Sequence, residues 1–521
     1  MRFLRLLSAA CAASSLLLAA GCARQAPPPQ SSAPAPAERK FAPEELRADF
    51  ADLYQGLKSA HYDLYARAGR AEYDRLYAEM LADIRAPETR YRAARRFQHF
   101  AAFGRVAHAR IDDNYRAWAA HLEHGGRAFP LAIRFRGGRA FVAGGGGSLV
   151  AAGEELIAIE GRPIAGWLRT GIRNISADTD YMAGALLELD LPMVLWLELG
   201  ERDTFHVAVR GPDGKDRRIE IPARTRSEML AAAGLEPPKL DLAAADRTFT
   251  ILPGNVAYLR PGAFYNAVAG AADPYDNKAF RAFIDQAFER FIAAGAKSLI
   301  VDIRDNPGGD SSFSDLMLSW FADRPFRFAS AFRIRVSPEA IESNRKRIET
   351  SADAARISGQ FAALYAGAKP GDAVDFPIPE ARPREGQRFE GRVFVLINRN
   401  SYSNAVAVAA TVQDYRFGAI IGEETSDLAT TYGAMETFTL KRTGIPVGFP
   451  KAYIIRPSGS LEARGVVPDV PIETPIVEGP EDPVLQRARE IALRVVASQV
   501  ESPDDPARTK HRKDRAVHGS L

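Results

Sequence analysis

Cysteine is nearly absent from this chain: only Cys11 and Cys22 occur among its 521 residues. Cys11 lies in an N-terminal stretch that is expected to be removed, so the mature chain has no cysteine pair. This excludes a disulfide framework and a thiolate metal site. A His-Glu-x-x-His metal motif, a Gly-x-Ser-x-Gly elbow and a phosphate-binding Gly-Lys-[Ser/Thr] loop are missing too. We therefore expect neither a metal nor a cofactor.

Neither acidic nor basic residues are in large excess, because their charges nearly cancel to a net charge of +3. Without a basic surface interleaved with aromatic residues there is no reason to expect nucleic acid as a partner. Hydrophobic residues make up 46% and charged residues 26% of the chain, as in an ordinary globular protein. The length alone suggests about three domains.

The N-terminus predicts export. Residues 1–22 contain two arginines, then an apolar stretch too short to span a membrane, and end in Leu-Ala-Ala-Gly-Cys22. This ending resembles the lipobox of bacterial lipoproteins, which implies lipidation of Cys22 and anchoring in the cell envelope. Ala23 resembles the residue found in lipoproteins of the outer membrane, so we expect the periplasmic side of that membrane. Simple secretion is the alternative. Residues 23–40, rich in Pro and Ala, predict a flexible tether.

The remaining chain divides by periodicity. Residues 41–125 repeat apolar side chains every three or four positions and predict a helical cap. Residues 128–222 change to a period of two and predict a β-rich module. In residues 248–475 strands and helices alternate, which predicts an α/β core. A helix over 480–498 and a disordered tail over 499–521 complete the chain.

One short segment of the β-rich module carries a resemblance of its own. The sequence Gly-Glu-Glu-Leu-Ile-Ala-Ile-Glu-Gly begins at Gly153 and resembles the strand and turn that mark PDZ domains. We therefore describe the module as PDZ-like. A run of glycines at 144–147 replaces the helix that usually precedes this turn, which leaves peptide binding by the module open.

The most informative segment runs from residue 393 to residue 425. It reads as a buried strand, a turn with the sequence Asn-Ser-Tyr-Ser-Asn, an apolar helix and a second strand. A serine at such a turn has an exposed hydroxyl, and the amides of the helix start could stabilise an oxyanion beside it. Upstream, Ser298–Asp310 is another buried strand that ends in a glycine turn. Together they predict a serine hydrolase with a divided site.

Both segments resemble the C-terminal processing (tail-specific) serine peptidases and their tricorn core relatives. The resemblance implies that Ser403 is the nucleophile, with Ser401 as the less favoured candidate. It also implies an oxyanion hole made by the backbone amides of Asn404 and of Gly308 or Gly309. Glycine suits that turn because a backbone without Cβ can come close to the reacting carbonyl.

The general base is the point at which the chain departs from the tail-specific pattern. Those enzymes use a lysine 25 residues after the serine, but Leu428 stands there and residues 425–433 contain no lysine. The tricorn-like branch uses a histidine ahead of the PDZ-like module, which His108 resembles; His61 is the alternative. The Leu-Glu-Ala-Arg-Gly segment around Glu462 resembles the place of that branch's catalytic glutamate. Ala107 stands where the branch has an orienting serine.

The resemblance implies a crotonase-like spiral of ββα units for the core, with the cap and the PDZ-like module attached. The implied activity is that of a serine endopeptidase that hydrolyses exported or unfolded polypeptides by acyl transfer through Ser403 and His108. A ligand- or peptide-binding lipoprotein on the same scaffold is the alternative, since such a protein tolerates loss of the base. The sequence leaves the oligomeric state open.

Overall fold

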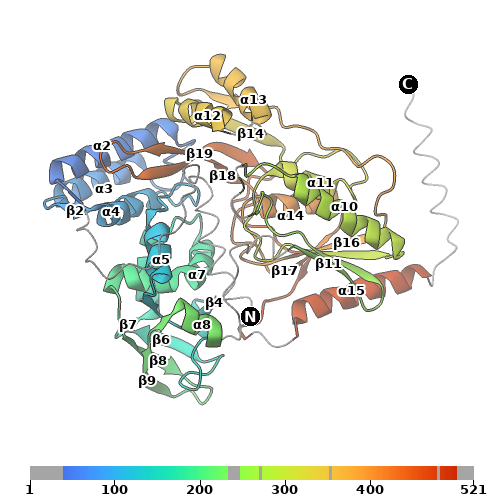
Figure 1. Ribbon diagram of the computed structural model, residues 1–521, viewed down its shortest axis with the longest axis horizontal. Coiled ribbons are helices and arrows are strands. Elements are labelled where there is room, and N and C mark those ends of the chain that lie inside the picture. Colours follow the sequence, from blue (N-terminus) through green and yellow to red (C-terminus); the bar gives the residue numbers. More distant parts are fainter. Residues whose placement is uncertain are drawn as a thin grey trace, which may run out of the picture.

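The computed structural model describes residues 39–232, 247–268, 271, 273–350, 355–477 and 481–500. The signal segment, Cys22 and nearly all of the tether lie outside the described residues, as does the tail beyond residue 500. In the described part of the chain, no helix has both the length and the apolar character needed to cross a membrane. Figure 1 shows how the helices and strands are arranged in space. The names cap, module and core are kept for the predicted residue ranges.

The core contains a mixed sheet whose strands lie in the order β11-β12-β13-β16-β17-β20. From β12 to β20 the neighbouring strands are parallel, and β11 pairs antiparallel with β12 at the edge. The strands of this sheet are β11 (Thr248–Leu252), β12 (Val256–Arg260), β13 (Ser298–Asp302), β16 (Arg392–Ile397), β17 (Ala419–Gly422) and β20 (Val470–Pro471). This arrangement confirms the α/β class, while the crotonase-like spiral stays a prediction.

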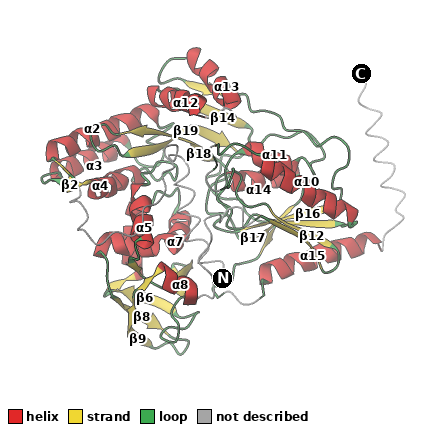
Figure 2. Cartoon of the chain, in the orientation of Figure 1, coloured by secondary structure: helices red, strands yellow, loops and turns green. Residues whose placement is uncertain are grey.

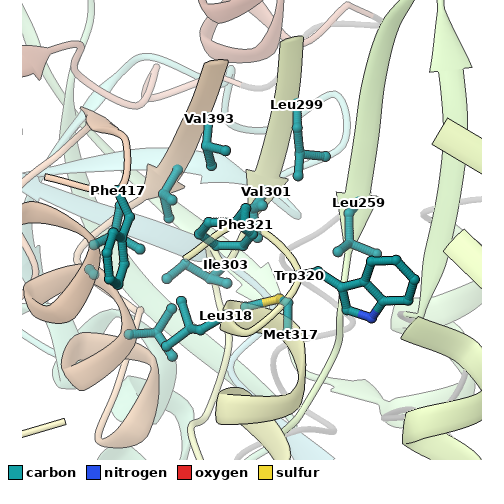
Figure 3. Packing of buried hydrophobic residues seen from close by; sticks show 14 of the residues in the cluster. Leu259, Leu299, Val301, Ile303, Met317, Leu318, Trp320, Phe321, Val393 and Phe417 are labelled. Carbon is teal, nitrogen blue, oxygen red and sulfur yellow. The ribbon is translucent and has the colours of Figure 1, made fainter. Parts of the chain in front are cut away.

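Helices cover both faces of this sheet (Figure 2). One face packs on α10 (Lys278–Ala293), α11 (Ser311–Leu318) and α14 (Asn404–Tyr415) through a large apolar cluster. Figure 3 shows part of this cluster, in which Leu259, Val301 and Val393 from the strands meet Met317 and Trp320 from the α11 region. The other face packs on α15 (Pro483–Val500). Burial on both faces explains why these strands read as continuous apolar runs.

The cap shares its interior with a second sheet of the core. Its elements are β1 (Lys40–Phe41), α2 (Pro43–Ala60), α3 (Arg70–Asp83), β2 (Glu88–Thr89), α4 (Arg90–Ala102) and α5 (Asp113–Glu123). The second sheet has the order β15-β14-β19-β18. Its strands and the helices beside them are β14 (Ala331–Arg335), α12 (Pro338–Thr350), α13 (Ala355–Ala366), β15 (Ala373–Asp375), β18 (Thr431–Thr439) and β19 (Pro446–Ile455). Apolar side chains of both parts form one cluster, so the cap is packed onto the core.

The module is an antiparallel sheet with helices packed beside it. Its elements are β3 (Arg127–Ala128), β4 (Ala132–Arg136), β5 (Arg139–Gly144), β6 (Glu155–Ile159), β7 (Arg162–Pro163), α6 (Ile164–Asn174), α7 (Asp180–Leu199), β8 (Thr204–Arg210), β9 (Asp216–Pro222), β10 (Arg224–Thr225) and α8 (Arg226–Ala232). The sequence patterns indicated only the strands. α7 was missed because it is apolar on nearly every side and contains Pro192, so it lacks the periodicity of a surface helix. The PDZ-like assignment stays a prediction.

A buried ion-pair network joins the module to the core. The guanidinium of Arg399, which precedes the serine turn, donates to the carboxylate of Glu188 on α7 at 2.6 Å and to the carbonyl of Phe135 at 2.8 Å. It also pairs with Glu423 just after β17. All three charged side chains are largely removed from water. The network therefore fixes the start of the serine turn relative to α7.

Candidate functional site

Two turns meet at the carboxyl ends of β13 and β16, which are neighbouring parallel strands. The turn after β13 carries the glycines, and the turn after β16 carries Ser403. They are joined directly, because the amide of Tyr402 donates to the carbonyl of Asn306 at 2.9 Å. The side chains of Asp305 and Asn398 are also hydrogen bonded at 2.8 Å. Ligand sites of open α/β sheets are found at this end of the strands.

The glycine turn is held in place by buried charge. Arg304 donates to Asp302 at 2.6 Å and to Asp482, just before α15, at 2.7 Å. Asp302 also accepts a hydrogen bond from Tyr258 at 2.8 Å. These contacts give the charged residues of the Asp-Ile-Arg-Asp-Asn-Pro-Gly-Gly motif a structural role. They brace the end of β13, from which the glycine turn begins.

Gly308 lies against the serine turn as closely as a backbone can. A Cβ atom built on it would lie 2.5 Å from the carbonyl oxygen of Tyr402, 2.7 Å from the amide of Asn404 and 2.9 Å from the Cβ of Ser403. Its φ of +87° also favours glycine. The Gly308 amide itself donates to the side-chain oxygen of Asn306 at 2.9 Å. Among the described residues the amide of Gly309 has no such acceptor, which favours Gly309 of the two predicted glycine donors.

Ser403 stands immediately before the first residue of α14 and has a strained backbone, with φ 54° and ψ −120°. Residues other than glycine rarely adopt a positive φ, and such backbone strain is often found at functional sites. Ser401 has a different setting. Its buried hydroxyl donates to the carbonyl of Ile303 at 2.8 Å and accepts from the amide of Asn398 at 3.1 Å. Ser401 therefore holds the turn together, and Ser403 is the better nucleophile candidate.

The fold brings His108 to the serine turn although the two are far apart in sequence. Its ring lies against the ring of Tyr402, with 5.8 Å between centroids and an angle of 29° between planes. The segment is anchored on both sides of the ring. The amide of Ala107 donates to the buried carboxylate of Asp178 at 3.0 Å, and the backbone of Arg110 pairs with that of Gly448.

Burial and the nearby Arg110 guanidinium lower the pKa of His108 to about 4, whereas the carbonyl of Tyr432 acts in the opposite direction. The ring is therefore neutral at neutral pH and can accept a proton. Its Nδ1 is buried and has no hydrogen-bond partner within the described part of the chain. This nitrogen is therefore free to accept a proton.

His61, the alternative base, is also buried, and its pKa is lowered to about 3, first by burial and then by Arg335. Its Nδ1 accepts a hydrogen bond from the amide of Asp63 at 3.1 Å, so it ends α2 as a local cap. Its ring lies 6.3 Å from that of Tyr432. Only His108 contacts the residue next to Ser403, which favours His108 between the two.

Glu462 is placed differently from the other predicted residues. Its side chain is 65% exposed and lies 3.6 Å from the guanidinium of Arg464. Its loop is nevertheless adjacent to the site. The amide of Ala429 donates to the carbonyl of Arg464, and the side-chain hydroxyl of Thr430 donates to the carbonyl of Ser460. The structure thus brings Gly308 against Ser403 and Asn404. It places His108 on the ring of Tyr402, the neighbour of Ser403, while the Nδ1 of His108 makes no hydrogen bond to Ser403. No contact of Glu462 with Ser403 or His108 is found among the described residues.

One residue of the site was missed by the sequence reasoning. Asp427 is 1% exposed, and its carboxylate accepts a hydrogen bond from the amide of Ser403 at 2.6 Å. Burial raises its pKa to about 7. It precedes Leu428, the position of the lysine in tail-specific enzymes. An acidic residue beside the position of the family's lysine is the feature of the sequence that could have pointed to Asp427.

Metal chemistry has no candidate centre here: within the described ranges, no group of three or more His, Cys, Asp and Glu side chains could hold an ion.

Comparison with known proteins bears on the fold and on the residues of the core. No curated protein matches the chain in sequence. Among solved structures, mature CPAF aligns with a TM-score of 0.59 and 15% identity over 88% of this chain and 98% of its own. Mature CPAF complexed with lactacystin gives a TM-score of 0.57 and 15% identity over 88% of this chain and 100% of its own. At this identity the likeness establishes the fold. Residues 255–472 match the model of Peptidase family S41.

Proposed function

We propose that this protein is a serine endopeptidase that cleaves polypeptides with Ser403 as nucleophile and His108 as general base. The observation that supports it most is the position of Ser403. It is strained, lies at the start of α14 and is in close approach to Gly308, within the residues that match a peptidase family. A protein that only binds ligands does not require this approach of two backbones around one hydroxyl.

In the proposed reaction the Ser403 hydroxyl attacks the carbonyl carbon of a peptide bond. His108, neutral because its pKa is lowered to about 4, takes the hydroxyl proton and returns it to the leaving amine. The amides of Asn404 and Gly309 donate to the oxyanion. One such donor contributes roughly 3–4 kcal/mol of transition-state stabilisation in other hydrolases. Water then cleaves the acyl-enzyme with His108 again as base. Glu462 stays a predicted orienting residue.

We propose further that the substrates are exported or unfolded polypeptides and that the protein is anchored by lipid at Cys22 on the periplasmic side of the outer membrane. Both proposals rest on the N-terminal sequence. Metabolic labelling with a fatty acid analogue tests the anchor. We expect the label in the wild type and none in the Cys22→Ala variant, with the wild type in the membrane fraction and the variant released. Equal labelling of both would refute it.

A fluorophosphonate probe tests the nucleophile. We expect one serine to be labelled in the full chain, and peptide mapping to place it at Ser403. Ser403→Ala should abolish labelling, and Ser401→Ala should retain it in whatever fraction folds. A chain that is folded but not labelled would instead be a ligand carrier, which is the alternative function.

The base is tested in the same assay. His108→Gln should remove labelling, whereas His61→Gln, a matched change of a second buried histidine, should retain it. The opposite pattern would assign the base to His61. Incubation with an unfolded peptide library, followed by mapping of the cut sites, then shows which bonds are hydrolysed.

A further inference from the structure

Asp427 lies in the loop between β17 and β18, and both of its carboxylate oxygens are used. Oδ2 accepts from the amide of Ser403 at 2.6 Å, and Oδ1 accepts from the amide of Leu428 at 2.9 Å. The loop is itself fixed, because the hydroxyl of Thr425 donates to the carbonyl of Asp427 at 2.8 Å and accepts from the amide of Val466 at 2.9 Å. A buried carboxylate with two amide donors is a firm anchor point.

The anchored amide belongs to the residue whose backbone is strained. Ser403 has no side-chain cap at the start of α14, and its φ of 54° is unfavourable for a residue with a Cβ. Such a conformation persists only where neighbouring contacts hold it. The hydrogen bond to Asp427 fixes the amide, and thereby the direction in which the Cα–Cβ bond presents the hydroxyl. The carboxylate also lies near the positive end of the α14 dipole, where negative charge is favoured.

We propose that Asp427, as a carboxylate, is a positioning residue that holds Ser403 in its reactive conformation. This inference rests on the proposed function, because it assumes that Ser403 is the nucleophile. Asp427 acts through the backbone and does not take the serine proton. In its protonated form, or as an asparagine, one of the two positions becomes a donor that faces an amide N–H, so one of the two contacts is lost.

The charges around Asp427 decide when it is ionised. Burial and the neighbouring Asp178 raise the pKa to about 7, while the amides of Ser403 and Leu428 and the guanidinium of Arg110 act in the opposite direction. The hydroxyl of Tyr402 is the other titratable group that faces it, and it stays neutral because burial raises its pKa. A carboxylate that titrates near neutrality gives the reaction an acid limb at about pH 7. The histidine would give one near pH 4.

The experiment measures the second-order rate of fluorophosphonate labelling of the full chain between about pH 5 and pH 9, a range that brackets the pKa of Asp427 and stays above that of His108. For the wild type we expect the rate to fall as the pH drops through about 7. For Asp427→Asn we expect a rate roughly 10- to 100-fold lower at pH 8 and no limb near pH 7. Asp315→Asn is the matched control. Its carboxyl is largely buried on α11, with a pKa raised to about 7, first by burial and then by Asp310.

The outcomes distinguish a failure of the proposed function from a failure of the role assigned to Asp427. If the wild type is not labelled at Ser403, the proposed function fails. If Asp427→Asn reacts at the wild-type rate with the same acid limb, or if Asp315→Asn removes that limb, the role of Asp427 is wrong although the nucleophile stands. Circular dichroism checks that each variant is folded. If Asp427→Asn does not fold, the wild-type profile still decides, because a rate that is constant from about pH 8 to pH 6 overturns the inference.

Discussion

Replacement of Gly308 by alanine gives a sharp test of how the two turns make the site. The new Cβ would lie 2.5 Å from the carbonyl oxygen of Tyr402, 2.7 Å from the amide of Asn404 and 2.9 Å from the Cβ of Ser403. These atoms belong to the backbone or sit directly on it, so no flexible side chain can move aside. The two turns must therefore separate, and the oxyanion donors move away from the serine hydroxyl.

The size of the effect follows from two contributions. A residue with Cβ at positive φ costs roughly 1–2 kcal/mol, and overpacking at a tight contact costs about 1–3 kcal/mol. We therefore expect the free energy of unfolding to fall by about 2–5 kcal/mol. Loss of one aligned oxyanion donor lowers the rate by roughly 100- to 1,000-fold in related chemistry, and we expect a loss of that order.

The assay pairs labelling of Ser403 with urea unfolding of the same preparation. Gly295→Ala is the matched control, because Gly295 has a φ of +66° and nothing within 4 Å of an added Cβ. It should lose stability by about 1–2 kcal/mol and keep its labelling rate. If Gly308→Ala is folded and labelled within threefold of the wild type, the close approach of the two turns is not needed for reactivity, and the proposed oxyanion hole is refuted.

Three further predictions concern buried charge. His108→Gln should shift the midpoint of acid unfolding, measured by circular dichroism, to lower pH. A buried histidine whose pKa is lowered to about 4 makes the wild-type protein lose stability as the pH falls from about 6.5 to 4, and glutamine removes this loss. An unchanged midpoint contradicts this. The stability of Asp427→Asn relative to wild type should rise between pH 6 and pH 8, because a pKa raised to about 7 means that the wild type loses stability as the pH rises through 7, whereas the variant has no carboxyl to ionise. An equal difference at both pH values argues against it. Arg399→Met should lower the free energy of unfolding in urea by about 3–5 kcal/mol, because it leaves Glu188 and Glu423 without their buried partner. A loss below about 1 kcal/mol would show that water reaches the network.

The sequence predicted the local parts of the core well. The strands β13 and β16, the helix α14 and both turns lie where their patterns indicated. Each of these is decided by short-range features: an apolar run, a glycine turn or a helix start. The family resemblance implied that the two turns meet, and the pairing of β13 with β16 as parallel neighbours gives the physical reason, because it brings their carboxyl ends to one edge.

Contacts between distant segments were harder to predict. Nothing near His108 in the sequence indicates Asp178, whose carboxylate accepts a hydrogen bond from the amide of Ala107 and so holds the segment before His108. Asp427 could not be recognised from a motif, because its carboxylate contacts the backbone amide of Ser403 and a backbone amide is present at nearly every position. α7 was missed because a helix buried on most sides has no polar face to set its period.

The pairing of Arg304 with Asp482 makes the glycine turn depend on a distant part of the chain. The two residues are 178 positions apart, and Asp482 lies just before α15, the helix that covers the second face of the core sheet. Docking of α15 on the sheet therefore also delivers a carboxylate to the buried Arg304 guanidinium. Mutations that loosen α15 should consequently disturb the glycine turn although none of them touches it.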